Sequence, residues 1–251
     1  MPRRNIKLTI QYDGSAYHGW QVQPDVATVE AHISGAIEKL FGKEVCVNGA
    51  SRTDAGVSAL CQVVSIKVDT PVPTENMAKA LTGMLPDDIA VVEAVEVEND
   101  KWNAISSPSV KLYRYTINTA KTPPVLDIRH CWHFPKALDV EAMSKAAALL
   151  VGEKDFKSFA TASDERKSSV RTVKSCCVTA DGEHVYVEVS ANGFLYNMVR
   201  NIVGTLVEIG RGRWGYEVIE EILEAKDRSA AGPIAPAAGL CLMSIEYEDL
   251  K

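Results

Sequence analysis

Two hydrophobic periods alternate along the chain, and this alternation constrains the fold more than any other feature. Residues 6–12 carry an apolar side chain at every second position, which is typical of a strand with one buried face. Further along, Val29, Ile33 and Ile37 recur at helical spacing, and Gly42 follows the last turn. Because strand-like and helix-like segments follow one another, the sequence predicts a mixed α+β fold.

The first half of the chain predicts the order strand, helix, strand, strand, helix, strand. After the helix that begins near Thr28, strands are expected at residues 44–48 and 60–68, a helix at residues 74–85 and a strand at residues 89–97. This is the order of a ferredoxin-like unit.

The second half predicts elements of the same kind. Asp181-Gly182 lies between two alternating runs and is a strong hairpin signal. We therefore expect two α+β halves, residues 1–105 and 106–251, around a largely antiparallel sheet, with a binding cleft where they meet. The expected strands of the second half are residues 110–118, 173–179, 184–189 and 240–247, and the expected helices are residues 139–151, 195–209 and 216–225.

Composition describes an ordinary globular protein, with 46% hydrophobic and 24% charged residues among 251. No apolar run approaches the roughly 20 residues of a membrane helix, and no secretory signal opens the chain, so we expect a soluble, cytoplasmic protein. The formal charge of −6 (27 basic, 33 acidic) lacks the basic balance of many nucleic-acid-binding domains. Cations do cluster locally, for instance at residues 166–174, and could line a groove.

The six cysteines form no C-x-x-C pair, so free thiols are expected. The nearest approach to a metal cluster is His130, Cys131 and His133, but no second pair at ligand spacing accompanies them. We expect no metal site. The cysteines are Cys46, Cys61, Cys131, Cys176, Cys177 and Cys241.

The segment from Ser51 to Val57 holds one carboxylate, Asp54, between small residues. One interpretation is structural: Asp54 closes a turn before Gly56, and Arg52 is a surface charge. The other is functional, because small neighbours allow a polymeric substrate to approach Asp54 closely enough for nucleophilic attack. The local pattern alone favours the first.

Five ordered motifs, however, resemble the tRNA pseudouridine synthase A (TruA) family. Together they span residues 12–240, nearly the whole chain, and five motifs in order are far harder to meet by chance than one. The motifs are Tyr12-Asp13-Gly14 with Tyr17-His18-Gly19-Trp20-Gln21; Arg52 to Val57 with Ala59 and Gln62-Val63; Lys111-Leu112-Tyr113-Arg114-Tyr115; Phe194-Leu195 with Met198 to Gly204; and Ala231-Gly232-Pro233 with Ala235-Pro236 and Gly239-Leu240.

The resemblance implies a pseudouridine synthase fold with a central RNA cleft and an isomerase that needs no cofactor. Its substrate would be uridine in the anticodon arm of tRNA, at positions 38, 39 and 40, and the protein would be a homodimer. The implied catalytic residues are Asp54 as nucleophile, Tyr113 stacked on the uracil, and Arg200 paired with the aspartate. The implied substrate-binding residues are Arg52, which fills the stack when the base leaves it, Tyr113, and Leu240 or Leu242 at the pocket wall.

Structural alternatives remain for three of these residues. Tyr113 could be a core aromatic, Arg200 could belong to a structural ion pair, and Leu240 would be buried in any fold. The chain also departs from the family pattern at Ser58, where histidine is frequent, and this puts one substrate contact in doubt.

Three other functions compete with the main hypothesis. A non-catalytic RNA-binding module could share the fold, but it has no need of an Asp54, Tyr113 and Arg200 constellation. A synthase could also act on other tRNA positions. A carboxylate glycosidase would require a second acidic residue, and none stands out.

Overall fold

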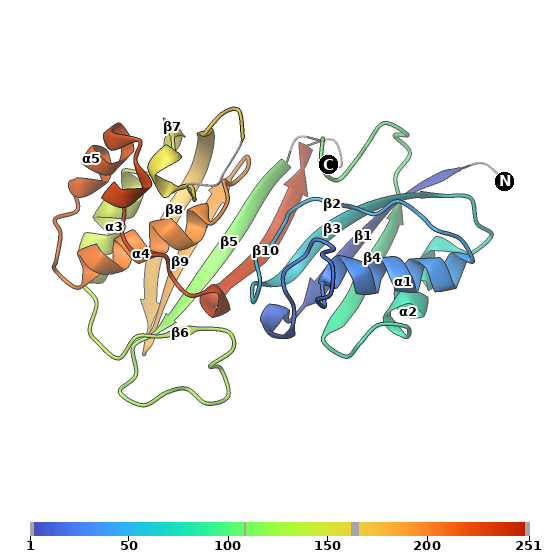
Figure 1. The fold of residues 1–251 in the computed structure, drawn as a ribbon, viewed down its shortest axis with the longest axis horizontal. Coiled ribbons are helices and arrows are strands. Elements are labelled where there is room, and N and C mark those ends of the chain that lie inside the picture. Colours follow the sequence, from blue (N-terminus) through green and yellow to red (C-terminus); the bar gives the residue numbers. More distant parts are fainter. Residues whose placement is uncertain (1–2, 108, 162–165, 249–251) are drawn as a thin grey trace. The chain divides into compact units, whose positions relative to one another are not determined.

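The computed structural model describes residues 3–107, 109–161 and 166–248 (Figure 1). The chain divides into two compact units. Unit 1 comprises Met1–Pro108 and Leu242–Lys251, and unit 2 comprises Ser109–Cys241. The boundary passes through the last strand, β10 (Leu240–Tyr247), most of which belongs to unit 1.

Unit 1 contains a sheet with the strand order β4-β1-β3-β10. Strand β1 lies between β3 and β4 and pairs antiparallel with both. The side chains of Ile6, Leu8 and Ile10 are fully buried, as the alternating pattern predicts. The strands are β1 (Arg4–Tyr12), β3 (Ser58–Val68) and β4 (Ile89–Glu96), and the short β2 (Asn48–Gly49) pairs with β3.

Two helices accompany this sheet, α1 (Val29–Phe41) and α2 (Thr74–Thr82). Helix α1 follows Thr28 and ends at Gly42, whose φ of 67° lies in the left-handed region that glycine tolerates. The Gly42 N–H donates to the Glu38 carbonyl at 2.8 Å. Helix α1 therefore begins and ends where its sequence signals predict.

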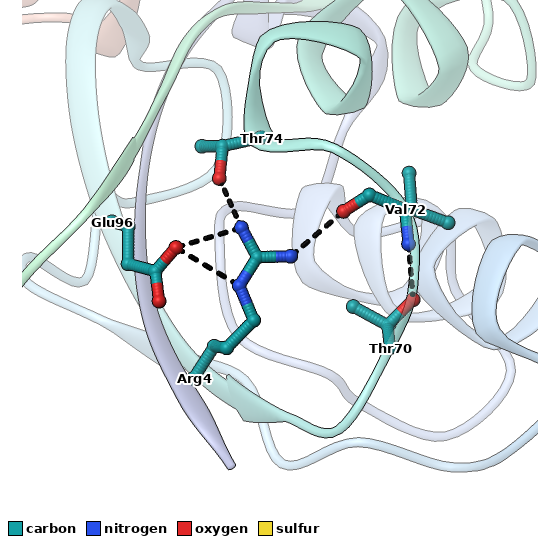
Figure 2. A network of polar contacts seen from close by, with 5 residues as sticks. All are labelled: Arg4, Thr70, Val72, Thr74 and Glu96. Carbon is teal, nitrogen blue, oxygen red and sulfur yellow. Dashed lines mark hydrogen bonds and ion pairs between the residues drawn. The ribbon is translucent and has the colours of Figure 1, made fainter. Parts of the chain in front are cut away.

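Arg4 links β1 to β4 and to the start of α2 through hydrogen bonds (Figure 2). Its Nε and Nη2 donate to Glu96 at the end of β4, at 2.9 and 2.7 Å, and its Nη1 donates to the Val72 carbonyl at 2.8 Å. Its Nη2 also contacts the Thr74 hydroxyl at the start of α2. The hydrogen bond from Arg4 lowers the pKa of Glu96. One guanidinium thus joins β1, β4 and α2.

Unit 2 has a sheet with the strand order β5-β9-β8-β7. Neighbouring strands in this order pair antiparallel, and β8 and β9 form the expected hairpin around Gly182, whose φ is 57°. The short β6 pairs parallel with β5. The strands are β5 (Ser109–Asn118), β6 (Trp132–His133), β7 (Gly152–Asp155), β8 (Val170–Asp181) and β9 (His184–Ala191).

Three α-helices belong to the described part of unit 2: α3 (Val140–Ala148), α4 (Met198–Gly210) and α5 (Val218–Ala225). Asp139 caps α3, because its carboxylate accepts a hydrogen bond from the Ala142 N–H at 2.9 Å. Helix α3 packs on β8 and on α4. Every residue of α4 is buried except Arg200, which makes this arginine the exception in a core helix.

The α+β class and the largely antiparallel pairing are confirmed. The strand expected at residues 44–48 is wrong, because only Asn48 and Gly49 pair with β3. The helix expected from residue 195 begins at Met198, since Asn197 has a left-handed φ of 61°. The helix expected at residues 74–85 ends at Thr82. Strands β6 and β7 are too short to show a period.

The six cysteines, all within the described residues, form no disulfide with one another. None of the helices in the described residues is long and apolar enough to cross a membrane.

Candidate active site

Asp54 opens a tight turn immediately before β3. The Val57 N–H donates to the Asp54 carbonyl at 3.1 Å, and Gly56 supplies the positive φ, 79°, that such a turn requires. The Gly56 N–H also donates to the Tyr17 carbonyl at 3.2 Å. Asp54 itself is half-buried. Its backbone is thus fixed by the turn and by a second segment of the chain.

That second segment, residues 12–20, packs against the turn too closely for side chains. A Cβ on Gly19 would lie 2.7 Å from the Thr53 carbonyl oxygen, and one on Gly14 would lie 2.0 Å from the Val57 carbonyl oxygen. The Trp20 N–H donates to the same Thr53 carbonyl at 3.0 Å. The two glycines of this motif therefore brace the aspartate loop by backbone approach.

Ser51 and Thr53, the residues on either side of Arg52, are held by hydrogen bonds to other parts of unit 1. The hydroxyls of Tyr12 and Thr53 are hydrogen-bonded at 2.7 Å. The buried amide of Gln62 accepts from the Ser51 N–H at 3.1 Å and donates to the Ser51 carbonyl at 2.5 Å. Ser51 and Thr53 are thereby anchored, while Arg52 is exposed and Asp54 is half-buried.

Ser58, where the family often has histidine, is buried at the first position of β3. Its Oγ accepts a hydrogen bond from the Gly14 N–H at 3.0 Å. In this chain the hydroxyl therefore joins the glycine segment to the strand that carries the aspartate turn.

Tyr113 lies on β5, opposite Val189 of β9, and is 5% exposed. The edge of the Phe194 ring meets it nearly perpendicularly, with the ring centroids 5.1 Å apart and the planes at 88°. Phe194, which belongs to one of the five motifs, thus fixes the orientation of the tyrosine ring.

Arg200 is held by two hydrogen bonds within unit 2. Its Nε donates to the Ala235 carbonyl at 2.8 Å, and its Nη1 donates to the Asn197 side-chain oxygen at 2.9 Å. Asn197 is itself in a left-handed conformation, which asparagine tolerates better than most residues. The guanidinium plane is therefore oriented from two sides.

The segment of residues 231–236 lies directly on α4. A Cβ on Gly204 would stand 1.7 Å from the Pro233 carbonyl oxygen, and one on Gly232 would stand 2.8 Å from the Thr205 Cα. The Tyr115 hydroxyl donates to the Pro236 carbonyl at 2.7 Å. Burial raises the pKa of Tyr115, and the nearby charge of Arg200 opposes this rise. The proline-rich segment is a support for Arg200.

The two leucines expected at the pocket wall are buried at the start of β10. Leu240 is 6% exposed and belongs to unit 2, whereas Leu242 is 0% exposed and belongs to unit 1. Their role at a pocket wall stays a prediction.

The predicted site residues are distributed over both units. Arg52, Asp54 and Leu242 belong to unit 1, and Tyr113, Arg200 and Leu240 belong to unit 2. The pairing of Asp54 with Arg200 stays a prediction that rests on the resemblance.

The residues around His130 serve local packing. His133 Nε2 lies 2.9 Å from the Ala120 carbonyl oxygen, and Cys131 is buried. Among the described residues, no group of three or more histidine, cysteine or acidic side chains is placed to hold a metal ion.

Sequence reasoning missed three residues that support the site. Tyr115 holds Pro236, Asn197 orients Arg200, and Gln62 holds Ser51. All three lie within the motifs or one residue from them, but only the folded structure shows which backbone groups they contact.

Comparison with known proteins places the chain among tRNA-modifying enzymes. The model of a family described as tRNA pseudouridine synthase matches residues 8–105 and 146–248. A protein named tRNA pseudouridine synthase A from Moorella thermoacetica is 47% identical over 244 residues, which cover 96% of this chain and 99% of that protein. Its namesake from Thermoanaerobacter sp. (strain X514) is 43% identical over 244 residues, covering 97% and 100%. Asp54 and Arg200 lie in the matched ranges, and Tyr113 lies between them.

Proposed function

The chain belongs to the tRNA pseudouridine synthase family, and we propose that it isomerises uridine to pseudouridine at positions 38, 39 and 40 of tRNA with Asp54 as nucleophile. The family and its relatives make the protein an isomerase that acts on uridine in tRNA. The three positions in the anticodon arm, and the role of each residue, are the proposal.

The observation that carries the proposal is the construction of the Asp54 turn. Gly14 and Gly19 approach its backbone too closely for any other residue, and Gly56 gives the turn its positive φ. If Asp54 served only to close the turn by a hydrogen bond, the turn would not require support from a second segment of the chain. A nucleophile, in contrast, must be held in one orientation, and rigid support supplies this.

The reaction breaks the bond between N1 of uracil and C1′ of ribose, turns the base, and forms a bond from C5 to C1′. C5 loses a proton and N1, released from C1′, gains one, so the product has the same composition as uridine, and nothing is oxidised. A carboxylate, with a reference pKa of about 3.9, is ionised at neutral pH and can attack either C6 or C1′.

The other residues act around this attack. Arg200, oriented by Ala235 and Asn197, pairs with Asp54 and keeps it ionised. Tyr113 stacks on the uracil, and Arg52, which is exposed beside the aspartate, fills the gap that the extruded base leaves. Leu240 and Leu242 wall the pocket.

We propose further that the protein works as a homodimer in the cytoplasm, with no cofactor. Sedimentation equilibrium at micromolar concentration tests the dimer. A monomeric protein with full activity contradicts this part of the proposal.

Incubation with an unmodified tRNA transcript tests the function. The expected product is a nucleoside of unchanged mass, isomeric with uridine, at positions 38, 39 and 40. Intact unmodified tRNA would indicate a binding module, and free uracil with an abasic site would indicate a glycosidase. An isomer elsewhere in the tRNA would keep the reaction but overturn the positions.

A further inference from the structure

We propose that Tyr17 and Asp88 are positioning residues, which hold the turn of Asp54 in the orientation from which its carboxylate attacks the uridine. In this proposal neither residue contacts the substrate, and both act through the backbone of the turn. The inference rests on the proposed function, because it takes Asp54 as the nucleophile.

The backbone of Tyr17 contacts the Asp54 turn directly. Its carbonyl accepts the hydrogen bond from the Gly56 N–H at 3.2 Å, and its own N–H donates to the Gly14 carbonyl at 3.0 Å. Gly14 and Gly19, which approach the turn too closely for side chains, stand on either side of Tyr17 in the sequence. A displacement of Tyr17 is therefore transmitted to the turn.

The side chain of Tyr17 anchors this segment to a third part of unit 1. Its hydroxyl donates to the Asp88 carboxylate at 2.5 Å. The side chain is buried, and the ring of His32 on α1 meets it edge-on, with the ring centroids 5.5 Å apart. Burial and the hydrogen bond with Asp88 raise the pKa of Tyr17, so the hydroxyl keeps its proton and stays a donor. A hydrogen bond from a hydroxyl to a carboxylate is among the strong ones, so it restricts the tyrosine side chain.

Asp88 is itself held by the sheet. It directly precedes β4, and its carbonyl accepts a hydrogen bond from the Asp13 N–H at 3.0 Å. Asp13 directly follows β1, whose last residue, Tyr12, pairs with Ile89 of β4. The bond between Asp13 and Asp88 thus continues the pairing of the two strands. The carboxylate that receives the Tyr17 hydroxyl therefore extends from a backbone position that the sheet fixes.

These contacts connect the β1–β4 pair with the nucleophile through Asp88, Tyr17 and Gly56. The rate of a chemical step depends steeply on the orientation of the reacting groups, and a misplacement of about 1 Å can cost about 100-fold. Binding of a large substrate depends on many contacts, so it is less sensitive to one turn. Loss of the anchor should therefore lower the rate of isomerisation and leave the affinity for tRNA nearly unchanged.

The test compares Tyr17→Phe with Tyr247→Phe. Each variant loses one hydroxyl from a buried tyrosine of unit 1, but the Tyr247 hydroxyl donates to the Ala104 carbonyl, at 2.7 Å, and not to a residue that holds the Asp54 turn. Single-turnover rates and the Kd of unmodified tRNA are measured well below the melting temperature of each variant. Tyr17→Phe should react about 10-fold more slowly with Kd within about twofold of the wild type. Tyr247→Phe should show a similar fall in melting temperature and keep the wild-type rate.

Substitutions of Asp88 test whether the hydrogen bond is the cause. Asp88→Asn keeps an oxygen that accepts from the Tyr17 hydroxyl and should retain most of the rate, whereas Asp88→Ala should lose as much as Tyr17→Phe. The double variant Tyr17→Phe/Asp88→Ala should be no slower than the slower single variant, because both changes remove the same bond. Losses that multiply in the double variant, or an Asn variant as slow as the Ala variant, would overturn the inference.

The tyrosine pair also separates positioning from stability. Equal losses of rate in Tyr17→Phe and Tyr247→Phe would mean that both act through stability alone, and this would overturn the inference. If the wild type isomerises no uridine, the proposed function fails. If the wild type is active and Tyr17→Phe keeps its rate, only the positioning role is refuted.

Discussion

Replacement of Gly204 by alanine tests whether the segment of residues 231–236 supports Arg200. The new Cβ would stand 1.7 Å from the Pro233 carbonyl oxygen, a backbone atom that cannot rotate away. The segment or α4 must shift, and the hydrogen bonds of Ala235 with Arg200, at 2.8 and 3.2 Å, would be strained or lost. Overpacking costs about 1–3 kcal/mol and each lost hydrogen bond about 1 kcal/mol.

Alanine gains up to about 1 kcal/mol over glycine as a helix former, so the expected net destabilisation is about 2–4 kcal/mol. Urea unfolding measures it. The matched control is Gly35→Ala in α1, where a Cβ would meet no atom within 4 Å and a gain of about 0.5–1 kcal/mol is expected. If Gly204→Ala were as stable as the wild type, the close approach on which this reasoning depends would be refuted.

Two other substitutions probe the charged residues. Arg200→Lys keeps the charge but loses the hydrogen bonds to Ala235 and Asn197, so turnover should fall about 10- to 100-fold while tRNA binding changes little. Arg200→Met should be nearly inactive. A wild-type single-turnover rate in the Met variant would mean that another cation pairs with Asp54. Lys111→Met removes a lysine whose pKa burial lowers from 10.5 in the unfolded chain to about 8 in the folded protein. Between pH 8 and 10.5 only the unfolded chain keeps this proton, so the lysine makes the free energy of unfolding of the wild type rise with pH over that range. Lys111→Met lacks this rise. The variant should therefore be more stable than the wild type by up to about 3 kcal/mol at pH 7, and the difference should close toward pH 10. Urea unfolding at several pH values measures it, and a difference that does not change with pH would contradict the cause.

Local signals predicted the elements whose ends depend on one or two residues. Helix α1 follows from the spacing of Val29, Ile33 and Ile37, and it ends at Gly42 with the expected left-handed φ. The hairpin of β8 and β9 follows from Asp181-Gly182. In both cases the residues that decide the structure are neighbours in the sequence.

The extent of other strands and helices depends on contacts with residues that are distant in the sequence, which the local pattern does not indicate. Residues 44–47 have strand-like composition, but within the described structure only the next two residues, Asn48 and Gly49, pair with β3. Helix α4 begins three residues late because Asn197 bonds with Thr161 and Arg200 in a left-handed conformation.

The candidate site likewise combines features that the sequence predicted with features that it could not predict. Asp54 was identified by its resemblance to a family, since a carboxylate between small residues is weak evidence alone. That Gly14 and Gly19 contact its turn could not be predicted, because they are distant in sequence and act through missing side chains.

The most direct test of the central claim is tritium release by Asp54→Asn from tRNA labelled at C5 of uridine. The wild type should release one label to water for each uridine isomerised at positions 38, 39 and 40. Asp54→Asn should bind the tRNA, keep its melting temperature within a few degrees and release none, because the amide preserves shape but not the nucleophile. Asp139→Asn is the control, since asparagine also caps a helix, and it should release label at the wild-type rate. A folded Asp54→Asn protein that releases tritium at the wild-type rate would contradict the account.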